Sequence, residues 1–337
     1  MIGNIVKGKV TEMKYVKIAG MGKYLPEKVY DNAYMESIVD TNNEWIVRRT
    51  GIETRHISAD DEFTTDMATK AAENALKNAG MDAEDIDLIM LATVTPDYFT
   101  PSCACVVQKN LGASNAAAFD FNTACSGFVS GVMIAKQFIE SGTYKNILLI
   151  AADVLSKATD YSDRATCVLF GDAAGAAVLT ASDEPGVIAC EMGADGTGGD
   201  TLTMLAYKED DTEVEKRVSH RKETIWMAGQ SVMKFAVKAM ADSSQSVLEK
   251  AGLTWDDIEL VVPHQANYRI VESAVKRMGI TEEKVFYTLN KYGNTSASCI
   301  PVALCEAVEC GRVKKGDNVI IVGFGGGLTY AAAVLTL

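Results

Sequence analysis

The sequence predicts an α/β fold made of two similar halves, each a mixed β-sheet covered by helices. An internal repeat indicates the two halves: the segment AGMDAEDIDLI from Ala79 matches AGLTWDDIELV from Ala251, an offset of 172 residues. Each copy follows a stretch of helical period and precedes a short apolar run, the order of elements in α/β units. The length of 337 residues, with 48% hydrophobic and 23% charged side chains, is sufficient for a large packed core.

The expected elements follow the same order in both halves. The first half contains a helix at 66–78, strands at 88–94 and 117–121, a helix at 125–142 and a strand at 146–151. The second contains a helix at 232–250, strands at 260–262 and 285–289, a helix at 295–311 and a strand at 318–322. Each half then ends on a glycine-marked hairpin, FGDAAGAAVLT from Phe170 and FGGGLTYAAAVLT from Phe324. We place the halves at residues 14–184 and 185–337.

Two segments lie outside the repeat. Residues 32–55 form an insertion that carries Trp45 and several arginines. Residues 193–224 are rich in glycine and then in charge, so we expect a mobile loop or flap there. Its GADGTGGD sequence resembles a phosphate-binding loop only superficially, because no βαβ unit frames it.

Charge and composition exclude several classes of protein. The net charge of −13 argues against nucleic acid or an anionic membrane as the main partner. The amino-terminal residues lack the apolar run of a signal peptide. Residues 318–337 are long and uncharged, but Gly325, Gly326 and Gly327 divide them into strand, turn and strand, so no membrane insertion is expected. Without an export signal, the eight cysteines indicate a reducing compartment, and we expect a cytoplasmic protein.

Cys125 is the candidate nucleophile. It lies in FDFNTACSGF, where an apolar strand turns through small residues into a helix. A thiol at a helix start points toward free N–H groups and the positive end of the helix dipole, so we expect a lowered thiol pKa. The alternative is a small buried cysteine without a catalytic role. That alternative is expected for the other seven cysteines: Cys103, Cys105, Cys167, Cys190, Cys299, Cys305 and Cys310. Cys103 and Cys105 are two residues apart, a spacing that fits no common zinc motif.

His264 is the candidate catalytic histidine. It follows the strand at 260–262 in VVPHQAN, and Pro263 fixes the exit of the chain. In α/β sheets, ligand and catalytic groups favour such strand ends, which outweighs the alternative of a structural core histidine. His56 and His220 lie among charged residues and are expected to be solvated or structural.

Asn294 lies in NKYGNTSAS, a second turn from strand to helix. It is 169 residues after Cys125, close to the repeat offset, so we expect the two residues on equivalent turns. The alternative is an ordinary helix N-cap asparagine. Gly325–Gly327 has no side chains, so its backbone N–H groups are able to approach a ligand and to form an oxyanion hole; the alternative is a tight turn only.

A Cys–His–Asn set fits two chemistries. Papain-like peptidases also have Cys, His and Asn in this chain order, but the local peptidase signature around the cysteine is absent. The other chemistry is thioester transfer: the cysteine takes an acyl group, and the histidine and asparagine stabilise the enolate formed by decarboxylation of a second thioester.

The motifs resemble those of the β-ketoacyl-acyl-carrier-protein synthase III family, the initiating condensing enzymes of type II fatty-acid synthesis within the thiolase-like superfamily. The resemblance runs from about Lys17 to the end and includes YLPE, NNEWIVRRTGIETRHI, ACSGF, FGDAAGAAVL, VPHQANYRI, NTSAS and FGGGLTY. It implies a thiolase-like fold with duplicated halves in an α-β-α-β-α arrangement of layers. It also implies that Cys125 takes a primer from acyl-CoA and that His264 and Asn294 promote condensation with malonyl-ACP. The N–H groups of Cys125 and Gly326 then form the oxyanion hole.

The resemblance also implies binding residues. The CoA site comprises Trp45, Arg49, Arg164, Gly229 and Asn267, although tryptophan beside arginine equally fits a cation–π surface contact. The patch for the acidic acyl carrier protein comprises Lys234, Arg269, Lys276 and Arg277, the last three on one helix face.

Further expectations from the resemblance concern assembly and specificity. It implies a homodimer that needs no metal or redox cofactor. Thr100 matches a position in the partner subunit's acyl pocket that is aromatic in acetyl-selective members, so we expect room for a longer or branched primer. About a dozen residues precede the usual start of the family. The alternatives are a secondary-metabolite synthase with the same triad, a cysteine hydrolase, and a scaffold that only binds carrier protein.

Overall fold

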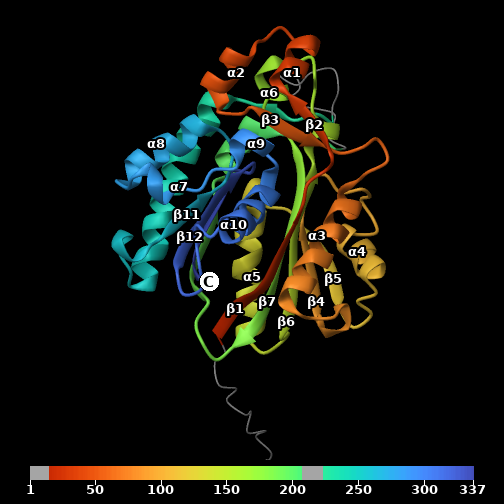
Figure 1. Ribbon diagram of the computed structural model, residues 1–337, viewed down its shortest axis with the longest axis vertical. Coiled ribbons are helices and arrows are strands. Elements are labelled where there is room, and N and C mark those ends of the chain that lie inside the picture. The colour runs from red at the N-terminus through yellow and green to blue at the C-terminus, as the bar shows by residue number, and fades with distance from the viewer. Residues whose placement is uncertain (1–14, 207–222) are drawn as a thin grey trace, which may run out of the picture.

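Two β-sheets form the frame of the protein in the computed structural model, which describes residues 15–206 and 223–337 (Figure 1). The five-stranded sheet has the order β1-β7-β6-β4-β5, and the four-stranded sheet has the order β11-β12-β13-β8. The strands of the first are β1 (Tyr15–Tyr24), β7 (Asp172–Ser182), β6 (Asn146–Val154), β4 (Leu88–Ala92) and β5 (Ala117–Phe121). The strands of the second are β11 (Leu260–Pro263), β12 (Asn318–Gly325), β13 (Thr329–Thr336) and β8 (Val187–Ala194).

Helices cover both sheets and fill the space between them, which confirms the expected α-β-α-β-α layers (Figure 1). The outer face of the five-stranded sheet packs against α3 (Thr64–Ala79) and α4 (Cys103–Leu111). The outer face of the four-stranded sheet packs against α7 (Gly229–Ala251) and α8 (Tyr268–Met278). The central layer consists of α5 (Gly127–Glu140) and α10 (Cys299–Glu309), whose apolar side chains share one core with both sheets.

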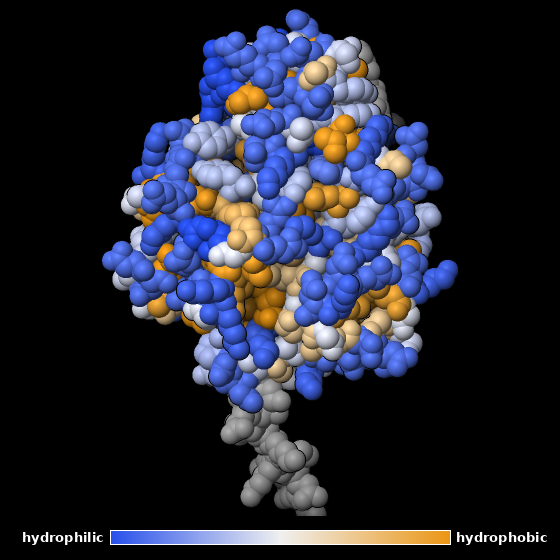
Figure 2. All heavy atoms as spheres, in the orientation of Figure 1, coloured by the Kyte–Doolittle hydropathy of each residue, from blue (hydrophilic) through white to orange (hydrophobic). Residues whose placement is uncertain are grey.

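Small residues let the central helix α5 approach the sheets closely. A Cβ atom on Gly131 would lie 2.4 Å from Leu149 Cδ1 of β6, so any larger residue would have to displace the Leu149 side chain. On the face shown in Figure 2, hydrophilic residues cover most of the surface, and apolar residues gather in the hollow over α5 between the two sheets. The core therefore lies in the central layer, directly below the site described next.

The two sheets have corresponding strand orders. β4 and β11 begin at Leu88 and Leu260, and β6 and β12 begin at Asn146 and Asn318, in both cases 172 residues apart. Each sheet then adds one antiparallel strand after another, β7 and β1 in the first and β13 and β8 in the second.

The predicted strand at 285–289 is wrong. Only an isolated parallel bridge joins Val285 to β11, and the chain then forms the short helix α9 (Leu289–Tyr292). The side chain of Gln265 accounts for the difference, because its amide accepts from the N–H groups of Thr288 and Leu289 and donates to Phe286 O. A side chain thus satisfies backbone groups that a strand partner would otherwise bind.

One of the two predicted hairpins is also wrong. The segment from Phe170 contains no hairpin turn, because β7 already begins at Asp172. Its antiparallel partner is β6, and the long connection between the two strands contains η3 (Leu155–Ala158) and α6 (Arg164–Cys167). The second hairpin is confirmed, since β12 and β13 pair directly around the glycine turn. Residues 318–337 are therefore strand, turn and strand, and among the described residues no helix has the length and apolar character to cross a membrane.

The two segments outside the repeat lie near the mouth of the cavity between the two sheets. The early insertion forms α1 (Asn32–Ile38), α2 (Asn43–Thr50) and β3 (Thr54–Ile57), which pairs with β2 (Lys28–Asp31). The glycine-rich segment forms η4 (Gly196–Thr201) and β9 (Leu202–Thr203), which pairs with β10 (Trp226–Met227). No βαβ unit frames it within the described chain, as expected. The amino-terminal residues 1–14, and residues 207–222 with His220, lie outside the described ranges.

Candidate active site

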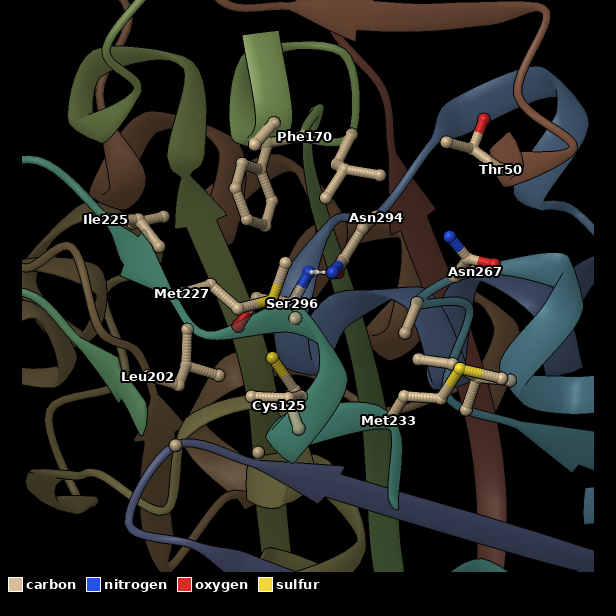
Figure 3. A pocket seen from close by; sticks show the side chains of 18 of the residues that line it. Thr50, Cys125, Phe170, Leu202, Ile225, Met227, Met233, Asn267, Asn294 and Ser296 are labelled. Atoms are coloured by element: carbon tan, nitrogen blue, oxygen red, sulfur yellow. Dashed lines mark hydrogen bonds between the residues drawn. The ribbon is translucent and has the colours of Figure 1, made fainter. Parts of the chain in front are cut away.

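A cavity of about 720 Å³ lies where the ends of the two sheets meet. Most of its lining is apolar, with side chains such as Phe170, Leu202, Met227 and Met233 around the polar groups (Figure 3). Sequence reasoning did not single out these apolar residues, because they come from separate segments that only the fold brings together. The cavity contains ten of the predicted site residues: Cys125, His264, Asn294, Gly326, Trp45, Arg49, Arg164, Gly229, Asn267 and Arg269.

Cys125 lies in the one-turn helix η2 (Ala124–Ser126), between β5 and α5. Ala124 has a positive φ of 47°, and its N–H donates to the Asn122 side chain at 2.9 Å. This sharp turn directs the Cys125 sulfur toward Ser296 in the cavity (Figure 3).

The expected lowering of the thiol pKa is wrong. Burial raises the pKa of the Cys125 thiol to about 12, and the nearby Ser296 hydroxyl offsets only part of that effect. The predicted helix start is correct, but desolvation by the surrounding cavity outweighs its effect on the thiol. The Cys125 thiol is therefore protonated at neutral pH.

Asn294 lies on a turn that repeats the geometry around Cys125, but at a different position in it. Ser296 has a positive φ of 57°, and its N–H donates to the Asn294 side chain at 2.9 Å. These values match Ala124 and Asn122 at an offset of 172, so the equivalent of Asn294 is Asn122 rather than Cys125. The predicted pairing at an offset of 169 is thus wrong by three residues.

Asn294 is held rigidly by both its side chain and its backbone. It is 7% exposed, and its backbone forms a parallel bridge with Phe170, donating to Leu169 O at 2.8 Å. Because Oδ1 accepts from Ser296, the amide nitrogen Nδ2 is the group available to a ligand. Asn294 Nδ2 donates no hydrogen bond to another residue within 15–206 and 223–337.

His264 follows β11 directly, as expected, and its N–H donates to Val322 O at 2.7 Å. The ring is 1% exposed, packs edge-on against Phe324 at 5.1 Å, and places Nδ1 3.0 Å from Cys299 Sγ. Burial lowers the pKa of His264 from 6.5 to about 3, so the imidazole is neutral at physiological pH. A neutral imidazole has one donor and one acceptor nitrogen, and it is suited to hydrogen bonding rather than to accepting a proton permanently.

The carboxyl end of β12 lies against the backbone of Cys125. A Cβ atom on Gly325 would be 2.5 Å from the Cys125 nitrogen, and one on Gly323 would be 3.3 Å from the Cys125 oxygen. The Cys125 backbone therefore leaves no room for a side chain at Gly325 and only a tight fit at Gly323. Gly326, which follows Gly325, lines the cavity. Cys125 and Gly326 thus line the same cavity, where the predicted oxyanion hole would lie.

The other end of the cavity carries the predicted CoA residues. Arg164 Cζ lies 5.0 Å above the Trp45 ring, so the cation–π contact considered for this pair is present. Asn267 caps α8 by accepting from the Arg269 N–H at 2.9 Å, and its amide donates to Arg49 O at 3.2 Å. Cationic and aromatic groups thus line the mouth, while the catalytic candidates lie deeper.

The predicted basic patch lies on α7 and α8 beside this mouth. Its four side chains are exposed, but Lys276 pairs with Glu272 at 2.7 Å and Arg277 with Asp242 at 3.1 Å. Within the described ranges, Lys234 and Arg269 form no ion pair, and of the four only Arg269 lines the cavity.

Two further predicted residues can be placed. Thr100 lies in an exposed loop next to Phe99, which is 73% exposed, and does not line the cavity of its own chain. His56 is half-buried with Nδ1 2.5 Å from Pro26 O, as expected of a structural residue. No cluster of three or more metal-ligating side chains occurs among the residues that the structure describes.

Comparison with known families identifies two matching regions. Residues 119–196 match the family model for 3-oxoacyl-[acyl-carrier-protein] synthase III, and residues 248–337 match the model for its C-terminal part. The β-ketoacyl-[acyl-carrier-protein] synthase III of Clostridioides difficile strain 630 is 52% identical over 318 residues, covering 94% of this chain and 97% of the relative.

Solved structures of similar synthases have the same fold as this chain. The 3-oxoacyl-[acyl-carrier-protein] synthase III of Aquifex aeolicus VF5 is 45% identical with a TM-score of 0.89, covering 96% of this chain and all of the other. The priming β-ketosynthase of the R1128 polyketide biosynthetic pathway is 36% identical with a TM-score of 0.92, covering 98% of both chains.

Proposed function

Because the chain belongs to the β-ketoacyl-[acyl-carrier-protein] synthase III family of acyltransferases in fatty-acid synthesis, we propose that Cys125, His264 and Asn294 carry out its decarboxylative condensation. The observation that carries this assignment is the shared cavity wall: a thiol, a neutral imidazole and an amide nitrogen face one apolar space. Such a set holds an acyl group and stabilises an oxyanion without a permanently charged residue.

In the first step, the Cys125 sulfur attacks the thioester carbonyl of an acyl-CoA primer. The tetrahedral oxyanion accepts hydrogen bonds from the N–H groups of Cys125 and Gly326. Collapse of the intermediate breaks the bond to CoA sulfur, and the departing thiolate takes the proton that the cysteine loses. Since the pKa of the free thiol is about 12, proton loss accompanies the attack rather than preceding it.

In the second step, malonyl-ACP places its thioester oxygen between His264 and Asn294. Loss of carbon dioxide leaves the electron pair as an enolate, and donation from His264 Nε2 and Asn294 Nδ2 stabilises the negative oxygen. The enolate carbon attacks the acyl-cysteine carbonyl, and the bond to the Cys125 sulfur breaks to release β-ketoacyl-ACP. Cys125 leaves as a thiolate and takes a proton from solvent, which replaces the proton that left with CoA in the first step. Thioester exchange and decarboxylation supply the driving force, so the proposed route uses no metal or redox cofactor.

The outer cavity fits the CoA moiety. Trp45 and Arg164, already stacked, offer a flat cationic platform for the base and phosphates, with Arg49 beside them. Gly229 and Asn267 also line the cavity, and the pantetheine would pass them.

The carrier protein would dock on the basic patch. Arg269 is the residue of the patch best placed for the phosphopantetheine end, because it lines the cavity. Lys276 and Arg277 are held by Glu272 and Asp242 until an acidic partner competes for them.

The active unit would be a cytoplasmic homodimer. Two features support the dimer: β5 is an edge strand on which Phe119 is 36% exposed, and Phe99, next to Thr100, is 73% exposed. Thr100 would enter the acyl pocket of the second copy, where its small side chain leaves room for longer or branched primers. If acetyl-CoA outcompetes isobutyryl- and butyryl-CoA by a wide margin in a primer panel, this specificity is wrong.

One experiment tests the proposed function. The protein is incubated with acyl-CoA alone and examined by intact mass, and malonyl-ACP is then added. We expect an acyl adduct that is absent from Cys125→Ser and that discharges as a β-ketoacyl product. Discharge to free acid would instead support a cysteine hydrolase, and no adduct would support a scaffold that only binds carrier protein.

A related synthase of secondary metabolism is the second candidate. The R1128 priming β-ketosynthase supports it, because that enzyme shares the whole fold at 36% identity. The higher identity to the fatty-acid enzyme, 52%, favours the first. Comparison of fatty-acid and polyketide carrier proteins as malonyl donors separates the two.

A further inference from the structure

Cys299, the first residue of α10, contacts the catalytic histidine from behind. Its sulfur lies 3.0 Å from His264 Nδ1 and accepts the N–H of Gln265 at 3.3 Å. The residue is 2% exposed and does not line the cavity, so it cannot touch substrate. Any effect of this thiol on the reaction must pass through His264.

The internal repeat shows that the turn itself does not need a thiol here. At the offset of 172, Cys299 corresponds to Gly127 and His264 to Ala92. The same contact exists in the first half, since a Cβ atom on Gly127 would lie 2.8 Å from Ala92 Cβ. The fold thus forms this turn with an Ala–Gly contact at one site and with a His–Cys contact at the other. The His–Cys pair occurs only beside the cavity.

The surroundings of the Cys299 sulfur decide which atom donates. The backbone N–H of Gln265 donates to the sulfur at 3.3 Å and so uses part of its capacity as an acceptor. Burial raises the pKa of the Cys299 thiol, so the S–H proton stays in place. His264 Nδ1 is the acceptor that the described residues place within reach of this proton.

We propose that Cys299 is a positioning residue: its S–H donates to His264 Nδ1 and so keeps the imidazole proton on Nε2, the nitrogen facing the cavity. A neutral imidazole carries one proton, so the acceptor role of Nδ1 makes Nε2 the donor. This inference rests on the proposed function, in which Nε2–H stabilises the enolate oxygen. The other tautomer would present a lone pair to that oxygen and repel it.

The tautomer is measurable without substrate or activity. Selective ¹⁵N labelling of histidine gives three residues to observe, and His264→Gln assigns the resonance of interest. In the wild type we expect a protonated Nε2 and an unprotonated Nδ1. In Cys299→Ala we expect both tautomers in exchange, and in Cys299→Ser, which keeps a hydroxyl donor, the wild-type pattern. A proton found on Nδ1 in the wild type would overturn the proposal.

Kinetics provide the second readout. Loss of one neutral hydrogen bond predicts an about 2- to 12-fold fall in kcat for condensation in Cys299→Ala, with acylation of Cys125 and the KM for malonyl-ACP unchanged. Cys299→Ser should recover most of the rate. Cys305 is the matched control, a buried cysteine on the same helix, and Cys305→Ala should behave as wild type.

The outcomes separate the two proposals. An unchanged kcat in Cys299→Ala, or a Cys299→Ser variant as slow as Cys299→Ala, would overturn the positioning role. Absence of an acyl adduct in the wild type would instead overturn the proposed function, while the ¹⁵N spectrum would still decide the tautomer.

Discussion

The buried imidazole of His264 makes a quantitative prediction about stability against pH. The ring is 1% exposed, and burial lowers its pKa from 6.5 to about 3. Replacement by glutamine keeps a neutral polar side chain but removes the titration. The variant should therefore lose less stability than the wild type when the protein is acidified.

The sign and size follow from proton linkage. Between pH 6.5 and 3 the unfolded chain binds a proton at this histidine and the native state does not, so acid favours unfolding. At pH 5 the solution is well below the ordinary pKa of the unfolded histidine, and the native ring is still neutral. The resulting loss of stability is about 2 kcal/mol, or roughly 30-fold in the unfolding equilibrium. At pH 7.5 the same term is close to zero.

Urea unfolding at pH 7.5 and pH 5, at one protomer concentration, gives the loss of unfolding free energy on acidification for each protein. The loss in the wild type minus the loss in His264→Gln is the contribution of the histidine. Burial raises the pKa of Asp153 and Asp172, which makes acid favour folding, but both proteins share that effect and it cancels. Asn294→Ala is the control, because it alters the same cavity wall without removing a titrating group. Equal pH dependence in the wild type and His264→Gln would refute the reasoning.

The remaining predictions concern the thiol, the amide and the patch. With a Cys125 pKa of about 12, its alkylation by iodoacetamide, followed by intact mass, should rise about tenfold per pH unit from pH 7 to 9; a plateau in that range contradicts this. Asn294→Asp keeps the oxygen that accepts from Ser296 but loses the Nδ2 donor, so the condensation rate should fall about 100-fold or more. The same change in the equivalent turn, Asn122→Asp, should leave the protein active; equal losses in both variants would show that only the turn matters. Arg269→Glu should raise the KM for malonyl-ACP about tenfold without slowing Cys125 acylation, whereas Lys315→Glu, the same change to glutamate before β12, should not; equal effects would mean that net charge alone acts.

The amino-acid sequence is sufficient to predict the repeat and most elements, because hydrophobic period and turn residues are local signals. It is insufficient where distant groups decide the outcome. The strand expected at 285–289 is absent because the Gln265 side chain binds its backbone groups. The Cys125 thiol pKa is raised rather than lowered because residues from several segments desolvate it, an effect that the helix start alone does not reveal.

The internal repeat also distinguishes Cys299 from the other buried cysteines. NTACSG from Asn122 and NTSASC from Asn294 align at the offset of 172, which places Cys299 opposite a glycine. A thiol at a position where the first half has no side chain is a signal present in the sequence itself. The alignment does not reveal the contact with His264, since His264 and Cys299 are 35 residues apart and meet only when β11 and α10 pack together.

The duplicated turns explain why the proposed chemistry divides between the two halves. The turns pack on each other directly, because a Cβ atom on Gly127 would lie 3.2 Å from Ala297 Cβ. Ala297 is the repeat equivalent of Cys125, so the second turn offers the position of a nucleophile but places a methyl group there. A condensation needs one acyl-enzyme carbonyl and one free thioester side by side. The first turn holds the thiol, and the second repeat supplies His264 and Asn294, so the two carbonyls lie against each other. Because Ala297 has no thiol, no second nucleophile competes for the acyl group.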